Sequence, residues 1–146
     1  WTAGRPVNLE KALTAGQSLG GHYVTGHVDG VGRVVARHDD ARSVRVEFEV
    51  PPELARYVAR KGSICVDGVS LTVNGASGRR FDVNLVPHTL EMTILGGYQQ
   101  GTRVNLEVDL VARYLERLLL GERAAEPGAE ASGITMELLA RSGFLG

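Results

Sequence analysis

The sequence predicts an all-β domain, a small antiparallel barrel with short helices and a carboxy-terminal helix, and three observations support this. Several short segments alternate between apolar and polar residues with a period of two, which is typical of strands with one buried face. Glycine is frequent, with 19 in 146 residues, and clusters with Asp, Asn and Ser between these segments, as tight turns require. About six such strands fit within residues 19–109, and closing them into a barrel removes exposed edges.

Each predicted strand is bounded by turn residues or proline. The clearest, Ser43–Val50, alternates strictly and pairs with Gly32–Arg37 across the polar turn at 38–42. Pro51 and Pro52 end it, and Pro52 opens a short helix through Ala59. The remaining elements are expected at Gly62–Val66, Val69–Asn74, Arg80–Val86 after a turn at 75–78, Pro87–Thr93 as a helical turn, and Arg103–Val108.

The last part of the chain differs in character. Leu110–Leu120 carries an apolar stripe at helical spacing, which predicts a helix that either packs on its own barrel or associates with copies of itself. Residues 121–133 have the composition of a linker, and Ile134–Phe144 has the pattern of a further short helix.

Composition excludes several functional classes. The net charge is -1 and the pI about 6.5, so the basic excess of a general nucleic-acid or acidic-membrane binder is missing. No apolar run is long enough to span a membrane, and no signal peptide is visible. A single cysteine excludes an internal disulfide and fits a reducing compartment. We therefore expect a cytoplasmic protein that binds neither nucleic acid nor membrane.

An internal repeat divides the chain. Gly4–Leu13 reads GRPVNLEKAL and Gly101–Leu110 reads GTRVNLEVDL, so the core V-N-L-E recurs with an offset of 97 residues. We therefore expect residues 1–18 to hold the final strand and linker of a truncated first unit. Residues 19–109 then form a complete second unit.

Polar side chains on the outer faces of two predicted strands form the candidate binding wall. If Val69, Leu71 and Val73 fill the barrel, then Ser70 and Thr72 lie outside, as do Asn105, Glu107 and Asp109 on the last strand. Hydroxyls, an amide and carboxylates on one wall suit a polyhydroxylated ligand, although a solvated strand surface has the same pattern.

Other reactive residues favour simpler interpretations. His22 and His27 are five residues apart, a spacing that places them on different faces of either a strand or a helix, so no metal site is expected. Cys65 lies in an apolar strand and is interpreted as a buried, inert thiol.

Four motifs together resemble the riboflavin synthase family: LGGHYVTGHVDGVGRV from Leu19, KGSICVDGVSLTVN from Lys61, FDVNLVPHTLEMTILG from Phe81 and GTRVNLEVD from Gly101. The family consists of two tandem six-stranded Greek-key barrels, each binding lumazine. The resemblance implies that 1–18 ends the first lumazine-binding barrel and that 19–109 is the second. Residues 110–146 would then be a helical region for oligomerisation and a tail.

The resemblance also implies an activity. The family converts two molecules of 6,7-dimethyl-8-ribityllumazine into riboflavin and 5-amino-6-(D-ribitylamino)uracil by transfer of a four-carbon unit, the last step of riboflavin biosynthesis. It uses no cofactor and no metal. The expected partners are the lumazine substrate, riboflavin, two further copies of the chain in a homotrimer joined by the carboxy-terminal helix, and lumazine synthase.

Site residues follow from the resemblance by motif position. Gly26, His27 and Val28 are expected on the first strand, lining the ring system. His27 is the expected catalytic residue, removing a proton from the methyl group at ring carbon seven, with substrate positioning as its alternative role. The other expected binding residues are Lys61, Ser70, Leu71, Thr72, Asn84, Leu85, Val86, Pro87, His88, Thr89 and Asp109.

Two other functions remain open at this point. A non-catalytic lumazine or flavin carrier of the antenna type would share the barrel and the binding wall. A purely structural barrel assembling through Leu110–Leu120 would need neither.

Overall fold

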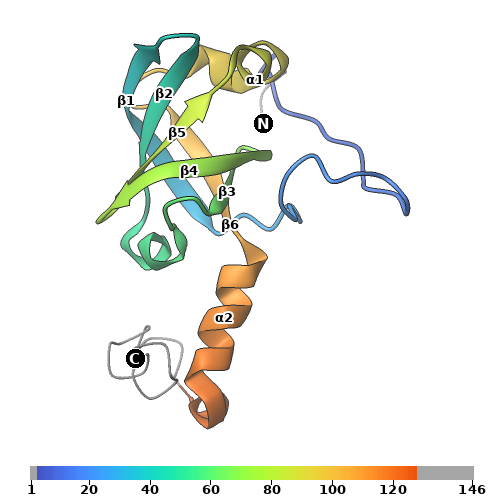
Figure 1. Cartoon of the computed structure of the whole chain (residues 1–146), viewed down its shortest axis with the longest axis vertical. Coiled ribbons are helices and arrows are strands. Elements are labelled where there is room, and N and C mark those ends of the chain that lie inside the picture. The colour runs from blue at the N-terminus through green and yellow to red at the C-terminus, as the bar shows by residue number, and fades with distance from the viewer. Residues whose placement is uncertain (1–2, 128–146) are drawn as a thin grey trace. The chain divides into compact units, whose positions relative to one another are not determined.

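In the computed structural model, which describes residues 3–127, six antiparallel strands close into a barrel in the order β1-β2-β5-β4-β3-β6 (Figure 1). Because β2 pairs with β5 rather than with the strand that follows it, the connectivity is that of a Greek key, and the predicted barrel is confirmed. The strands are β1 (Gly30–Asp40), β2 (Ser43–Glu49), β3 (Ser63–Val66), β4 (Val69–Ser77), β5 (Arg80–Leu85) and β6 (Arg103–Val108).

The alternating pattern of β2 fills the barrel as predicted. Val44, Val46 and Phe48 are buried, while the residues between them face outward. Phe48 pairs with Phe81 on β5, and their rings stack with centroids 5.1 Å apart. Tyr98 meets Phe48 edge-on, so aromatic packing joins the strands to the segment before β6.

Two turns differ from their predicted positions. β1 runs to Asp40, beyond the predicted Arg37, because the chain reverses within Ala41 and Arg42. β4 likewise continues to Ser77 through a register shift after Val73, so Gly75 belongs to a strand rather than a turn. A Cβ on Gly75 would lie 2.6 Å from Asp82 Oδ1, so a larger residue there would displace the end of the Asp82 side chain.

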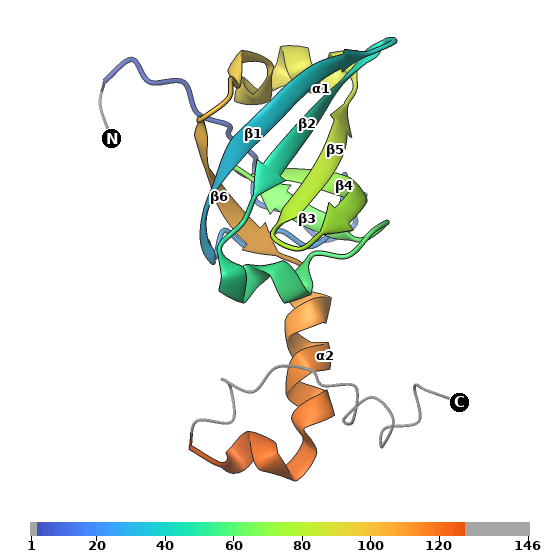
Figure 2. The same cartoon turned by 90° about the vertical axis from the view of Figure 1, so that its left-hand side faces the viewer.

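Short helices lie at opposite ends of the barrel in both views (Figures 1 and 2). At one end η1 (Pro52–Tyr57) buries Leu54, and at the other α1 (Pro87–Met92) leads into η2 (Ile94–Gly97), which buries Leu95. Both leucines belong to the barrel core, so the helices complete it. The predicted helix after Pro52 and the helical turn after Pro87 are confirmed, each a residue or two shorter than expected.

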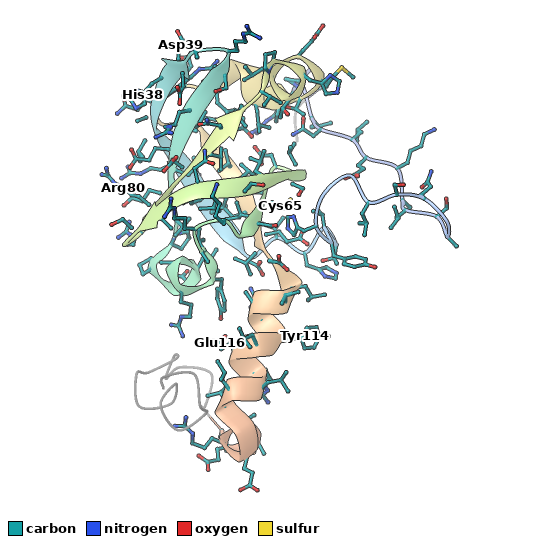
Figure 3. All side chains as sticks on the ribbon, viewed as in Figure 1. His38, Asp39, Cys65, Arg80, Tyr114 and Glu116 are labelled. Atoms are coloured by element: carbon teal, nitrogen blue, oxygen red, sulfur yellow. The ribbon has the colours of Figure 1, made fainter. Side chains whose placement is uncertain are left out.

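The helical region forms a separate unit that begins at Leu110. α2 (Leu110–Leu120) has the predicted bounds and is followed by η3 (Gly121–Ala125), at the start of the predicted linker. Tyr114 and Glu116 lie on opposite sides of α2 (Figure 3), as an amphipathic helix requires. The helix predicted at Ile134–Phe144 lies outside the described residues. Among residues 3–127, no helix combines the length and the apolar character needed to cross a membrane.

Candidate functional site

A row of three side chains crosses the outer face of β4, β3 and β6. Cys65 on β3 pairs with Ser70 on β4 and with Glu107 on β6, so the three side chains point outward from adjacent strands. The register therefore confirms that hydroxyl and carboxylate groups share one wall. We call Ser70, Cys65 and Glu107 the outer row.

The segment before β1 covers the Ser70 end of the row. The backbone N–H of His22 donates to Ser70 Oγ at 3.2 Å, and the Nδ1 atom of His22 lies 2.7 Å from the same oxygen. Gly21 allows this approach, because a Cβ on residue 21 would lie 2.4 Å from the Cβ of Ser70. The Ser70 hydroxyl is thus held by the protein and is not simply solvated strand surface.

The same segment covers the Glu107 end. Glu107 Oε1 accepts hydrogen bonds from the backbone N–H of Thr25 at 2.6 Å and from its hydroxyl at 2.8 Å, while Oε2 accepts from the Gly26 N–H at 2.9 Å. Thr25 Oγ1 also lies 3.1 Å from Nδ1 of His27. With three donors, Glu107 is only 6% exposed although it points away from the barrel core.

Asp67 fixes the turn between β3 and β4 at the edge of this wall. Its carboxylate accepts hydrogen bonds from the Tyr98 hydroxyl and from the Asn105 N–H, the latter at 2.8 Å. Burial and the neighbouring Asp67 carboxylate both raise the pKa of Tyr98 above its ordinary value. Tyr98 therefore stays a neutral donor and ties the turn to the core.

β4 and β5 separate on the side of the barrel nearest α1. Their paired register runs only from Val73↔Val83 to Ser77↔Arg80, and beyond it Val69–Thr72 pairs with β3 alone and Asn84–Leu85 with β2 alone. Figure 1 shows the two strands diverging towards α1. We call this region the β4–β5 split. One edge of each strand here has no strand partner, so its backbone groups are available to a ligand.

A cavity of about 700 Å³ lies on the other side of the outer row. Its lining includes Gly26, Val28, Cys65 and Glu107, together with the amino-terminal residues 5–8. This volume is within the usual range for small-molecule sites.

The structure brings most of the predicted site residues to the β4–β5 split. Ser70 and Thr72 point outward from one edge, and Asn84 points outward from the other, followed by the exposed Val86, Pro87 and His88 and the half-buried Thr89 at the start of α1. The backbone N–H of Lys61 donates to the carbonyl of Val73 at 2.8 Å, which places the Lys61 backbone beside β4 on its β3 side.

Other predicted site residues lie elsewhere or in a different setting. Gly26, His27 and Val28 are not on a strand, because Glu107 holds this segment as a loop before β1. Leu71 is 8% and Leu85 0% exposed, so their side chains fill the barrel and do not line the split. Asp109 is half-buried directly after β6 and lines neither the split nor the cavity.

Sequence reasoning missed three residues that organise the site. His22, Thr25 and Asp67 were not expected to take part, and Glu107 was expected outside the barrel but not as a buried group. Two of these four residues have a signal in the sequence: Glu107 is the last residue of the repeated V-N-L-E, and Asp67 belongs to the Asp67-Gly68 turn signal.

Cys65 is buried, as predicted, at 2% exposure. Its location on the barrel is labelled in Figure 3. Burial and the charge of Glu107 raise the pKa of its thiol to about 11. The described residues 3–127 hold no group of three His, Cys, Asp or Glu side chains that could bind a metal, because His22 and His27 turn to Ser70 and Thr25.

Comparison with known proteins identifies the family to which the barrel belongs. The model of the lumazine binding domain matches residues 25–109, which is more than half of the chain, and the protein belongs to this family. Riboflavin synthase of Photobacterium phosphoreum is 44% identical over 145 residues, covering 99% of this chain and 65% of that protein. Riboflavin synthase of Mycobacterium bovis is 53% identical over 119 residues, 80% of this chain and 59% of that protein. The resemblance found in the sequence motifs is confirmed.

Solved structures agree on the fold. The chain is similar to LumP complexed with riboflavin, with a TM-score of 0.60 and 26% identity over 64% of this chain and 50% of that one. LumP complexed with 6,7-dimethyl-8-(1'-D-ribityl) lumazine gives a TM-score of 0.58 at 24% identity, over 63% and 52%. The chain spans about 60% to 65% of the riboflavin synthases named above.

Proposed function

We propose that this chain is the lumazine-binding part of a riboflavin synthase. In that role it would help convert two molecules of 6,7-dimethyl-8-ribityllumazine into riboflavin and 5-amino-6-(D-ribitylamino)uracil, without a cofactor. The relatives named riboflavin synthase, at up to 53% identity, support the activity. The chemistry of the wall supports the ligand.

The β4–β5 split carries this proposal. A lumazine ring presents carbonyl oxygens and ring nitrogens along its edges, which match the free N–H and C=O groups of two unpaired strand edges. The outward hydroxyls of Ser70 and Thr72 lie beside one edge, and the backbone of Lys61 is bonded to the neighbouring Val73. Such groups suit the hydroxyls of a ribityl chain, and the buried Leu71 and Leu85 would support this wall from inside the barrel.

Site roles follow from this placement. Thr72, Asn84, Val86 and Thr89 would line the two sides of the ring, with Pro87 and His88 closing the end at α1. Gly26 and Val28 line the cavity on the other side of the outer row, so they would contact a ligand there rather than in the split. His27 would take the proton from the methyl group at carbon seven, since its imidazole is exposed and lies in the loop held by Glu107.

The repeat supports a first barrel upstream of residue 19. In β6 the repeated residues alternate, with Val104 and Leu106 buried in the core. Their counterparts Val7 and Leu9 are 37% and 90% exposed and form no strand. Val7 and Leu9 have the apolar alternation of a strand but are exposed, which is expected if residues 1–18 belong to a first barrel whose other strands would bury them. Residues 19–109 would then be the second barrel.

The exposed face of α2 supports a homotrimer. Tyr114, Leu115 and Leu118 are 64%, 46% and 76% exposed, and Leu118 lies one helical turn beyond Tyr114 and Leu115. A second and third copy of α2 would cover such a stripe. Residues 110–146 would thus serve oligomerisation, in a cytoplasmic enzyme whose neighbours in the pathway include lumazine synthase.

Lumazine binding and turnover test the proposal separately. Quenching of lumazine fluorescence is titrated with Thr72→Val, which should weaken binding by about tenfold through loss of one buried hydrogen bond, and with Thr72→Ser, which should not. Turnover is then measured with the upstream barrel present. Binding without riboflavin formation would establish a carrier, and no binding at all would contradict both ligand-based functions. His27→Ala should slow riboflavin formation at least about tenfold.

A further inference from the structure

Three groups form a continuous chain from the outer row to His27. Glu107 Oε1 accepts the hydroxyl proton of Thr25 at 2.8 Å, and Thr25 Oγ1 lies 3.1 Å from Nδ1 of His27. The backbone N–H groups of Thr25 and Gly26 hold the same carboxylate from two sides. This series of hydrogen-bonded groups therefore begins at the buried Glu107 carboxylate, which accepts three hydrogen bonds, and ends at the exposed imidazole of His27.

The proton positions along this chain follow from counting donors. The hydroxyl of Thr25 has one hydrogen, which it donates to Glu107. Its oxygen can then only accept from His27, so the Nδ1 atom of His27 must carry a hydrogen. In a neutral imidazole the other nitrogen, Nε2, is then without a proton and is the acceptor.

We propose that Glu107 and Thr25 are positioning residues that fix His27 in the Nδ1-protonated tautomer, so that Nε2 is the atom that accepts a proton from the substrate. The inference deepens the proposed function and rests on it for the identity of the substrate, but the tautomer is a property of the protein alone. Thr25 acts through its hydroxyl, and Glu107 acts by keeping the hydrogen of that hydroxyl directed away from the imidazole.

The buried carboxylate of Glu107 determines where the hydrogen of the Thr25 hydroxyl points. Thr25 is an exposed residue, so without Glu107 its hydroxyl would donate to water or to His27 with little preference, and both tautomers would then be populated. Glu107 is 6% exposed and accepts hydrogen bonds from the Thr25 backbone as well as from its side chain, so the Thr25 hydroxyl faces a carboxylate that is held in place. Orienting a base in this way through a second group recurs in enzymes that rely on histidine.

Nitrogen-15 NMR of the His27 ring, at a pH about two units above the ordinary pKa of histidine, measures the tautomer directly in this chain. The wild type should show hydrogen on Nδ1 and none on Nε2. Thr25→Val removes the hydroxyl at constant shape and should shift the ring to a mixture of tautomers, whereas Thr25→Ser keeps the hydroxyl and should match the wild type. Glu107→Gln replaces an acceptor oxygen by a donor NH₂ group and should also give a mixture.

The proposal is overturned if the wild-type ring carries its proton on Nε2, or if Thr25→Val leaves the tautomer unchanged. With the upstream barrel present, Thr25→Val should lower kcat by about tenfold with KM within about twofold, and Thr25→Ser should restore kcat. If no riboflavin forms in any variant, the proposed function fails while the NMR result still decides the tautomer.

Discussion

Replacing Gly21 by alanine should detach the segment around His22, which precedes β1 and covers Ser70, from the outer row. The new Cβ would lie 2.2 Å from Ser70 Oγ and 2.4 Å from Ser70 Cβ, whereas carbon atoms in contact are separated by about 3.5 Å or more. The segment must therefore move by roughly 1 Å. Such a shift breaks the 2.7 Å contact between His22 Nδ1 and Ser70 Oγ, and also the 3.2 Å bond from the His22 N–H. Two hydrogen bonds at about 0.5–1.5 kcal/mol each give a loss of about 1–3 kcal/mol.

Gly20→Ala is the matched control, because a Cβ on Gly20 meets no atom within 4 Å. Both substitutions reduce the entropy of the unfolded chain alike, so the comparison isolates the clash. Hydrogen exchange of the His22 amide reads the effect directly, since 1–3 kcal/mol corresponds to about 5- to 150-fold faster exchange. Equal protection of this amide in the two variants would refute the structural reasoning.

Three further predictions concern other parts of the molecule. Cys65, with its pKa raised to about 11, should react with iodoacetamide at pH 8 about a hundredfold more slowly than the unfolded thiol; a rate that levels off near pH 9 would contradict this. Tyr98→Phe should lower the free energy of unfolding by about 1.5–3 kcal/mol, because it removes a donor to the Asp67 carboxylate, while Tyr23→Phe, at an exposed position, should not. The pKa of Tyr98 is raised in the folded state, so its contribution to the free energy of unfolding is complete below the ordinary tyrosine pKa and is lost as the pH rises above it. Urea titrations should therefore show that the difference in free energy of unfolding between the wild type and Tyr98→Phe narrows above about pH 10. Removing residues 110–146, or introducing Leu118→Asp on the exposed face of α2, should lower the molar mass measured by light scattering from that of a trimer to that of a monomer. A molar mass that is unchanged in both variants would show that α2 does not join copies of the protein.

The barrel could be predicted because its signal is local. Alternation in Ser43–Val50 reports burial on one face, and the bounds of β6 and α2 were predicted to the residue from periodicity alone. Turns were less predictable, because Gly75 was read as a turn residue. Gly75 instead lies within β4, opposite Asp82, and this position depends on a register shift that the sequence does not signal.

The site could be predicted only where strand alternation determined it. Ser70 and Thr72 were expected to face outward because Leu71 and Val73 face inward, and they do. The β4–β5 split was not foreseen, since the end of a paired register depends on how two strands diverge in space. His22 and Thr25 belong to a segment without periodicity, and their partners lie 48 and 82 residues away in the chain.

The repeated V-N-L-E illustrates how structure gives a sequence pattern its physical meaning. In the second copy the two apolar residues fill the barrel, the Asn105 N–H donates to Asp67, and Glu107 holds the loop that carries His27. Val104, Leu106 and Glu107 therefore contribute through their side chains, whereas Asn105 contributes through its backbone. Glu10 ends the first copy at the same position, and an apolar strand needs no glutamate there. Its recurrence is explained if a Thr-Gly loop of the proposed first barrel is held in the same way, which would give the two barrels equivalent binding faces.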